Sequence, residues 1–134
     1  MRWGLFVGRP LQRWSRGRVV LLGDAAHAML PHHGQGANTT IEDAVTLAEL
    51  LALTAPGEID AMLARYQALR RTRTRVIQRS SRATNELLHL PDGPALGPRD
   101  RRVSRFPDDF GWIHEFDAMR SAAEACQLAR APGP

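Results

Sequence analysis

The feature of this sequence that most constrains its fold is a short apolar run that stops at a glycine and an aspartate. The run, Val19 to Leu22, is unbroken and contains two β-branched residues, which predicts a strand buried on both faces. Gly23 ends the run, and Asp24 stands where the strand would emerge. In open α/β sheets, residues at that end of a strand contact ligands. We therefore expect an α/β architecture with a ligand-facing turn at these two residues.

The next stretch predicts a bend and then a loop. From Ala25 to Pro31 the residues are mostly small or apolar and a proline closes them, so one turn of helix and a bend are expected. His32 and His33 follow. The segment Gly34 to Asn38 then contains two glycines, which allow the backbone to approach a bound molecule closely.

A long helix is predicted after this loop. Asn38, Thr39 and Thr40 are candidate N-caps, and Glu42 has capping-box spacing to Thr39. One face is apolar through residues at helical spacing: Ile41, Ala44, Val45, Ala48, Leu51 and Ala52. A glycine loop that opens onto a helix N-terminus presents free N–H groups and the positive end of the helix dipole. It predicts a site for an anion or a partly negative ligand atom.

Several of these residues also have simpler interpretations. Asp24 fits a role in capping the turn as well as a role in ligand contact. His27 fits a hydrogen-bonded structural histidine. With His32 and His33 it has a spacing that zinc could use, but no cysteine or further carboxylate is fixed nearby, so we predict no metal site. The chain has no G-x-S-x-G motif of a serine hydrolase, and the Gly-x-Gly of the loop does not directly follow the strand as a dinucleotide fingerprint would.

The order of these motifs resembles a known family. Residues 17–27 read GRVVLLGDAAH, residues 31–38 read PHHGQGAN, and residues 41–44 read IEDA. Together they are similar to the second FAD-binding region of the single-component flavoprotein aromatic hydroxylases, the family that includes salicylate and hydroxybenzoate monooxygenases. The resemblance implies FAD as the cofactor, NAD(P)H as the electron donor and a small aromatic substrate.

The same resemblance implies roles for individual residues. Gly23 and Asp24 would be cofactor ligands, with the aspartate holding a hydroxyl group of the FAD ribitol chain. Pro31 would lie beside the flavin ring and the substrate. His32 and His33 are further candidates there, without an assigned catalytic role. The other cofactor-binding candidates form the glycine loop, whose backbone would face the pyrimidine edge of the flavin: Gly34, Gln35, Gly36, Ala37 and Asn38.

A second long helix is predicted from near Glu58 to about Leu90. Its apolar positions follow helical spacing: Ile59, Met62, Leu63, Tyr66, Leu69, Val76, Ile77, Ala83, Leu87 and Leu88. Arginines crowd the opposite side: Arg65, Arg70, Arg71, Arg73, Arg75, Arg79 and Arg82. They could form a nucleic-acid surface, but aromatic interleaving is missing apart from Tyr66. We therefore favour a solvated helix face, from which one arginine could reach the cofactor or a neighbouring segment. The family has a Y-x-x-x-R-x-x-R pattern here, which Tyr66, Arg70 and Arg73 reproduce.

The two ends of the chain carry weaker patterns. Trp3, Leu5 and Phe6 look like the end of a strand and loosely resemble an element of the family's sheet over the substrate. Residues 91–107 are rich in proline, glycine and charge, which predicts a surface loop. Beyond it we expect an apolar cluster that packs back on the body, and then a short helix: Phe110, Trp112, Ile113, Phe116 and Met119, followed by Ser121 to Arg130.

Length and composition limit the class of protein. The chain has 134 residues, 43% of them hydrophobic, and a formal net charge of +4, which suits one globular domain and permits anionic partners. Cys126 is the only cysteine, which excludes an intramolecular disulfide and favours a reducing compartment. No apolar run reaches membrane-spanning length and the start lacks a signal-peptide pattern, so we expect a cytoplasmic protein without a membrane partner.

The family's N-terminal dinucleotide-binding motif, G-x-G-x-x-G, is absent from this sequence. We therefore expect a mostly helical α/β fragment, the C-terminal part of an FAD/NAD(P)-binding, hydroxybenzoate hydroxylase-like fold. It would have one buried strand, two long helices and a short C-terminal helix. Residues 1–90 would form the C-terminal part of the FAD-binding domain, and residues 91–134 a loop and tail that pack on it. Because the predicted strand needs neighbours, a missing N-terminal segment or a homo-oligomer would complete the fold.

Two functions from different classes follow from these observations. The leading hypothesis is the FAD-binding part of a flavoprotein monooxygenase that hydroxylates phenolic substrates with NAD(P)H and O2, is inactive alone and has no nucleic-acid partner. The alternative is a non-catalytic basic helical module whose arginines within residues 65–82 bind nucleic acid or an acidic protein. Salt separates the two, because binding to phosphates through several arginines weakens steeply as salt rises.

Overall fold

The computed structural model describes residue 4 and residues 7–130 of the chain. The expectation for Trp3, Leu5 and Phe6 lies outside these described residues. The elements, in chain order, are β1 (Ser15–Arg16), β2 (Val19–Val20), α1 (Asp24–His27), the 3-10 turn η1 (Pro31–His33), α2 (Gln35–Ala52), the 3-10 turn η2 (Pro56–Glu58), α3 (Ile59–Leu88), α4 (Leu96–Val103), α5 (Phe106–Asp109), α6 (Gly111–His114) and α7 (Ala118–Arg130).

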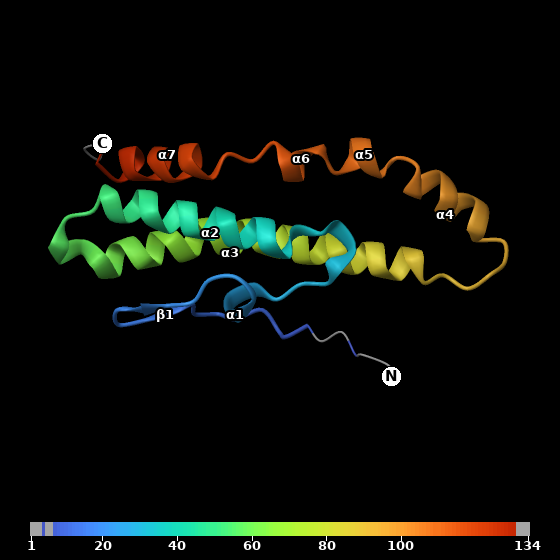
Figure 1. The fold of residues 1–134 in the computed structure, drawn as a ribbon, viewed down its shortest axis with the longest axis horizontal. Helices are drawn as coiled ribbons and strands as arrows, with labels where there is room; N and C mark the ends of the chain where they lie inside the picture. The colour runs from blue at the N-terminus through green and yellow to red at the C-terminus, as the bar shows by residue number, and fades with distance from the viewer. Residues whose placement is uncertain (1–3, 5–6, 131–134) are drawn as a thin grey trace.

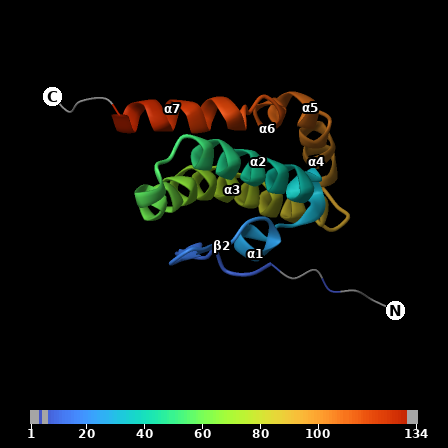
Figure 2. The ribbon, with the colours of Figure 1, turned by 60° about the vertical axis from the view of Figure 1, so that its left-hand side comes forward.

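Helices α2 and α3 form the central layer of the molecule. They lie side by side and antiparallel, with the short turn η2 between them (Figure 1). The segment from α4 to α7 returns along one side of this pair, and α7 packs against α2. The β1–β2 hairpin and α1 lie on the opposite side, as the turned view in Figure 2 also shows. The mostly helical architecture predicted from the sequence is confirmed.

The strand differs from its prediction. Only Val19 and Val20 are in a strand, and they pair antiparallel with Arg16 and Ser15 across a turn that Gly17 makes with φ 56°. Val19 is 69% exposed, so the expectation of a strand buried on both faces is wrong. Leu21 lies just beyond the assigned strand, and its N–H donates to the carbonyl of Trp14, the residue opposite it, at 2.8 Å. The hairpin is the whole sheet within the described residues, so each strand is paired along one edge only.

Helix α2 begins earlier than predicted. Its N-cap is Gly34 rather than a residue among Asn38, Thr39 and Thr40. The threonine hydroxyls donate to carbonyl groups of their own helix, from Thr39 Oγ1 to Gln35 O at 2.7 Å and from Thr40 Oγ1 to Gly36 O at 2.9 Å. The two hydroxyl groups therefore form their hydrogen bonds inside the helix and do not cap its N-terminus.

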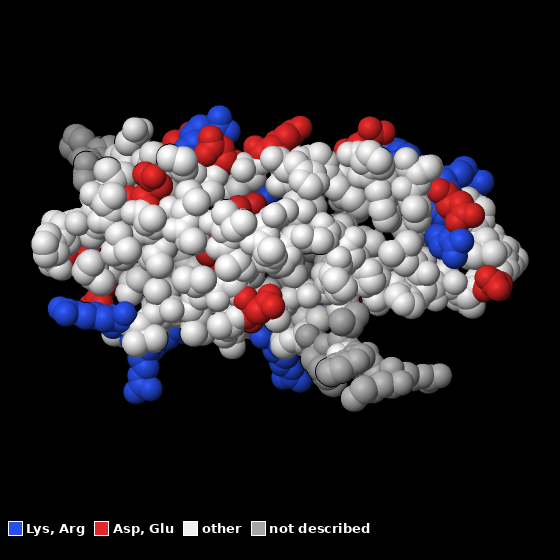
Figure 3. Space-filling model, in the orientation of Figure 1, with Lys and Arg blue, Asp and Glu red and all other residues white. Residues whose placement is uncertain are grey.

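The buried face of α2 also differs from the predicted apolar face. Five buried positions follow helical spacing and four of them are polar: Gln35, Thr39, Asp43, Thr46 and Leu50. The predicted face is largely open, with Ile41 62% and Leu51 46% exposed. Figure 3 shows few charged side chains on the surface over α2. The polar face turns inward because its groups find partners within the molecule.

Helix α3 spans nearly the predicted range. Its first half contributes Met62, Leu63 and Tyr66 to the apolar core, which also contains Trp14, Ala26, Leu50, Ala122 and Cys126. From Arg70 onward the helix buries mainly polar side chains, namely Arg70, Thr74, Gln78, Ser81 and Thr84, with Ile77 the apolar exception. The predicted apolar positions Val76 and Leu88 are each 41% exposed.

The C-terminal part contains more helix than predicted. Helix α4 forms within residues 91–107, where the sequence predicts a loop. Ile113 is buried, and the carbonyl groups of Trp112 and Ile113 accept hydrogen bonds from Arg73. Helix α7 begins at Ala118, three residues before the predicted start, and the Asp117 carboxylate accepts the Arg120 N–H at 2.9 Å. Among the described residues, no helix is long and apolar enough to cross a membrane.

Candidate functional site

The turn at Gly23 has a backbone conformation that only glycine adopts without strain. Its φ is 60° and its ψ is −144°, a region almost confined to glycine. The residue is buried against α2, where an added Cβ would lie 2.8 Å from Thr40 Oγ1 and 3.1 Å from Thr40 Cγ2. Both the backbone angles and the close approach to α2 therefore require a glycine here.

Asp24 follows as the first residue of α1 and is exposed. The helix is a single turn in which the N–H groups of Ala26 and His27 both donate to the Gly23 carbonyl at 2.9 Å. No hydrogen bond or ion pair within the described part of the chain engages the Asp24 carboxylate. A cavity of about 150 Å³ lies beside it. The turn thus presents a carboxylate that has no partner among the described residues.

A buried carboxylate on α2 holds this turn in place. Asp43 is 0% exposed, and its Oδ2 accepts the Gly23 N–H at 2.8 Å and His27 Nε2–H at 2.5 Å. Its Oδ1 accepts Arg70 Nε–H at 2.7 Å. Burial alone would raise the pKa of Asp43, but the hydrogen bonds from His27, Arg70 and Gly23 outweigh burial and lower the pKa from its ordinary 3.8. Asp43 is therefore an ionised acceptor that joins the turn, α1 and α3.

Arg70 provides the positive charge that balances Asp43. Its guanidinium group is fully buried, and Nη2 also donates to Glu42 Oε2 at 2.7 Å. Arg73 binds the same carboxylate through Nη2 and Oε1 at 3.0 Å and lies 4.3 Å from the centre of the Phe116 ring. Removing one member of such a buried cluster leaves an uncompensated charge, so the four ionic side chains act as one unit.

His32 and His33 are directed toward α3. His32 Nε2 lies 2.8 Å from Asn85 Oδ1, and His33 Nε2 lies 3.0 Å from Ser80 Oγ. The His33 ring also packs on Phe110, with ring centres 4.3 Å apart. Burial lowers the pKa of His33; the hydrogen bond with Ser80 opposes this shift and the neighbouring His32 adds to it. Each imidazole therefore uses one ring nitrogen to hold η1 against α3.

The predicted glycine loop is the first turn of α2. Gly34 is the N-cap with φ 62°, and Gln35 to Asn38 are helical. No described side chain caps this end, so the first N–H groups of an 18-residue helix are open to a ligand atom. A Cβ at Gly36 would meet no described atom within 4 Å. Pro31, the neighbouring predicted site residue, is exposed.

Residues that the sequence did not mark as part of the site join the Gly23–Asp24 turn to the first turn of α2. Thr40 packs on Gly23 and donates to the Gly36 carbonyl, so it links the Gly-Asp turn to the first turn of α2. Asp43 holds the same turn by accepting the Gly23 N–H. Its signal in the sequence was its place in the IEDA motif, and its partner Arg70 was marked only by the family's tyrosine-arginine pattern. The prediction that His27 is a hydrogen-bonded structural histidine is confirmed.

No group of three or more histidine, cysteine, aspartate or glutamate side chains is placed to hold a metal ion within the described residues. The ionic side chains around Asp43 pair with one another instead.

Comparison with known proteins identifies the region. Residues 6–81 match the family model described as an FAD binding domain. A 3-amino-4-hydroxybenzoate 2-monooxygenase of Streptomyces platensis is 45% identical over 118 residues, which are 87% of this chain and 30% of that protein. A salicylate hydroxylase of Pseudomonas putida is 41% identical over 130 residues, which are 92% of this chain and 29% of that protein.

A solved structure agrees with these relatives. A salicylate hydroxylase in complex with its substrate matches the fold with a TM-score of 0.74 and 37% identity, over 87% of this chain and 29% of that chain. The chain thus spans about 30% of the length of the relatives it matches. On these matches the chain belongs to the family described as an FAD binding domain.

Proposed function

We propose that this chain provides the ribitol-facing and ring-facing parts of an FAD site in a monooxygenase that hydroxylates small phenolic substrates with NAD(P)H and O2. The observation that carries the proposal is the Gly23–Asp24 turn, where an unpaired, exposed carboxylate stands on a base fixed by Asp43 and Thr40. A carboxylate of this kind is suited to accept hydrogen bonds from the hydroxyl groups of a ribitol chain.

The first turn of α2 supports the same proposal. In this assignment, the N–H groups of residues 35–38 face the pyrimidine edge of the flavin. The dipole of α2 stabilises the negative charge that a reduced flavin carries there. Gly36 leaves room for close approach, because a Cβ there would meet no described atom within 4 Å apart from its chain neighbours and the adjacent backbone of α2. The residues of the chain therefore fit the flavin end of FAD.

The other site residues have supporting roles in this proposal. Bound FAD would take a hydride from NAD(P)H and activate O2 for insertion into the aromatic ring. Pro31 borders the ring site, and His32 and His33 fix the 3-10 turn that carries it against α3. The lowered pKa of His33 keeps its imidazole neutral at pH 7, so it adds no charge beside the ring. Two relatives, a 3-amino-4-hydroxybenzoate 2-monooxygenase and a salicylate hydroxylase, are named for phenolic carboxylates, which supports a substrate of this class.

A chimera tests the proposal. Residues 7–130 replace the matching segment of the Pseudomonas putida salicylate hydroxylase, and FAD retained after dialysis is measured from the flavin spectrum. We expect the chimera to retain FAD and the Asp24→Asn variant to bind it about ten- to a hundredfold more weakly, the effect of losing one charge-assisted hydrogen bond. Asp60→Asn, at an exposed position in the first turn of α3, is the matched control. Equal FAD retention by both variants would remove Asp24 from the site.

A further inference from the structure

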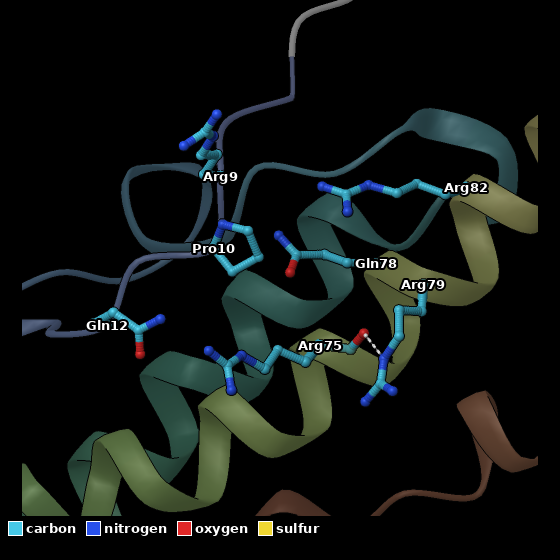
Figure 4. Close-up of a pocket in the computed structure, with 7 residues that line it drawn as sticks. All are labelled: Arg9, Pro10, Gln12, Arg75, Gln78, Arg79 and Arg82. Carbon is cyan, nitrogen blue, oxygen red and sulfur yellow. Dashed lines mark hydrogen bonds between the residues drawn. The ribbon is translucent and has the colours of Figure 1, made fainter.

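A groove outside the proposed flavin site is lined mainly by arginines. It has a volume of about 570 Å³ and lies between α3 and the segment of residues 9–12. Arg75, Gln78 and Arg82 extend from α3 toward the segment that carries Arg9 and Pro10 (Figure 4). Two separate parts of the chain therefore bring guanidinium groups to one hollow.

The wall opposite α3 is fixed by hydrogen bonds. The Gln12 side chain accepts a hydrogen bond from Arg71 of α3. Gln67 Nε2 donates to the Gln12 carbonyl at 3.4 Å, and Gln67 Oε1 accepts the Trp14 N–H at 2.6 Å. On the floor, the buried Gln78 donates from Nε2 to the Ala28 carbonyl at 3.0 Å. These bonds hold the segment across α3 and preserve the shape of the groove.

The positive charge of the groove has no internal counterpart. None of Arg9, Arg75, Arg79 and Arg82 forms an ion pair within the described residues, whereas Arg70 and Arg73 on the same helix do. Arg79 folds back, with Nε donating to the Arg75 carbonyl at 3.4 Å. Like charges four residues apart destabilise a helix by a few tenths of a kcal/mol per pair. An anion in the groove would relieve this repulsion.

The chemistry of the groove selects the kind of anion. Guanidinium groups bind phosphate oxygens in pairs through parallel N–H donors. Arg9 lies on the wall of the groove opposite Arg75 and Arg82, and a ligand with two linked phosphates has oxygens to offer to each wall. Among the described residues that line the groove, none has an aromatic side chain on which the bases of a nucleic-acid strand could stack. We propose that this groove binds the diphosphate group of a small nucleotide.

The groove lies next to the cavity beside Asp24. Arg9 and Gln78 also line the 150 Å³ cavity beside Asp24, so the two hollows share a wall. A nucleotide bound in the groove would lie next to the turn that carries Asp24. The proposal does not depend on the FAD assignment, because it needs only the arginines and their lack of internal partners.

Calorimetric titration of the 134-residue chain tests the proposal, with inorganic pyrophosphate, ADP, NADPH and adenosine at low salt. We expect pyrophosphate and ADP to bind and adenosine not to bind. The double variant Arg75→Gln/Arg82→Gln should bind at least about tenfold more weakly. The control Arg13→Gln/Arg101→Gln removes the same charge from exposed arginines outside the groove and should bind as the parent does. NADPH binding as strong as that of ADP would identify a dinucleotide as an acceptable source of the diphosphate.

Two outcomes would overturn the proposal. One is equal loss of binding in both double variants, which would show a diffuse effect of net charge. The other is a single-stranded oligonucleotide that binds more tightly than ADP and displaces it, which would show a nucleic-acid surface. Amide NMR of the unmodified chain provides a measurement without mutation, since pyrophosphate should shift the Gln78 side-chain amide and leave Asp100 unmoved. Shifts confined to residues outside the groove would also overturn it.

Discussion

At Gly23, the absence of a side chain decides whether the turn beside Asp24 can form. Two independent constraints act there, the positive φ and the contact with Thr40. Beneath them, Asp43 accepts the turn's N–H and ties it to His27 and Arg70. The proposed ligand carboxylate is therefore placed by residues that would not themselves touch a ligand.

The two constraints on Gly23 can be separated by mutation. Gly23→Ala should lower the free energy of unfolding by about 1 to 3 kcal/mol through backbone strain, with a further loss from the Thr40 contact. Thr40→Ala removes both close atoms. In the double variant, the loss of unfolding free energy caused by the Thr40 contact should therefore disappear, and the loss caused by backbone strain should remain. Urea unfolding of the two single variants and the double variant measures the coupling. Strict additivity of the two changes would contradict the described contact.

The buried carboxylate of Asp43 makes the stability of the chain depend on pH. The pKa of Asp43 is lower in the folded chain than its ordinary 3.8, so its contribution to stability is complete above that value. The contribution is lost as pH falls through the folded pKa. Asp43→Asn should cost about 3 to 5 kcal/mol near pH 7 and should flatten the decline in stability below about pH 4. Urea unfolding from pH 3 to 7 measures both effects, with Asp24→Asn as the exposed control. An unchanged acid slope in Asp43→Asn would assign the decline to other groups.

At the scale of elements, α2 carries two different surfaces. Its inner face meets α3 and α7 mainly through threonines, Asp43 and Leu50, and its first turn is open. The face that looks apolar in the sequence is largely exposed in this chain, as Ile41 and Leu51 show. Substitutions at the open turn and on the exposed face should therefore affect different properties.

Gly36→Val and Ala48→Val compare these two parts of α2. In the isolated chain each should change the free energy of unfolding by less than about 0.5 kcal/mol, because both positions have room for a side chain. In the salicylate hydroxylase chimera, Gly36→Val should lower FAD retention and flavin reduction more than Ala48→Val, since a branched side chain would block approach to the first turn. Normal flavin reduction in the Gly36 variant would mean that the turn does not face the flavin.

At the scale of the whole molecule, the chain matches about 30% of the length of its relatives. The described residues supply a flavin-facing turn and a helix N-terminus, and the sequence has no glycine-rich dinucleotide motif. Exposed apolar residues remain on α2 and α3, including Ile41, Leu51 and Val76. A surface of this kind favours association with another chain or segment.

The isolated chain should therefore neither hold FAD tightly nor hydroxylate an aromatic compound. Purified residues 1–134 mixed with FAD should lose the flavin during gel filtration, as followed by absorbance and fluorescence. The chimera serves as the positive control on the same column. Co-elution of stoichiometric FAD with a monodisperse monomer, or oxygen uptake that depends on NAD(P)H and yields a hydroxylated aromatic product, would contradict this prediction.

The sequence alone was sufficient for the family, the Gly-Asp turn and the two long helices, because each depends on local signals. Gly23 and Asp24 are ordered neighbours in a motif, and the helices carry their own periodicity and breakers. The α2 start was predicted a few residues late because the threonines that resemble caps satisfy their hydroxyl groups on carbonyls of their own helix.

Only the tertiary structure decided which faces are buried and which polar residues hold the turn. Asp43 finds His27 and Arg70 at sequence separations of 16 and 27 residues, which no local pattern specifies. Hydrophobic periodicity identifies an apolar face but not what covers it. The polar face of α2 is buried because partners on α1 and α3 neutralise its charge and satisfy its hydrogen bonds.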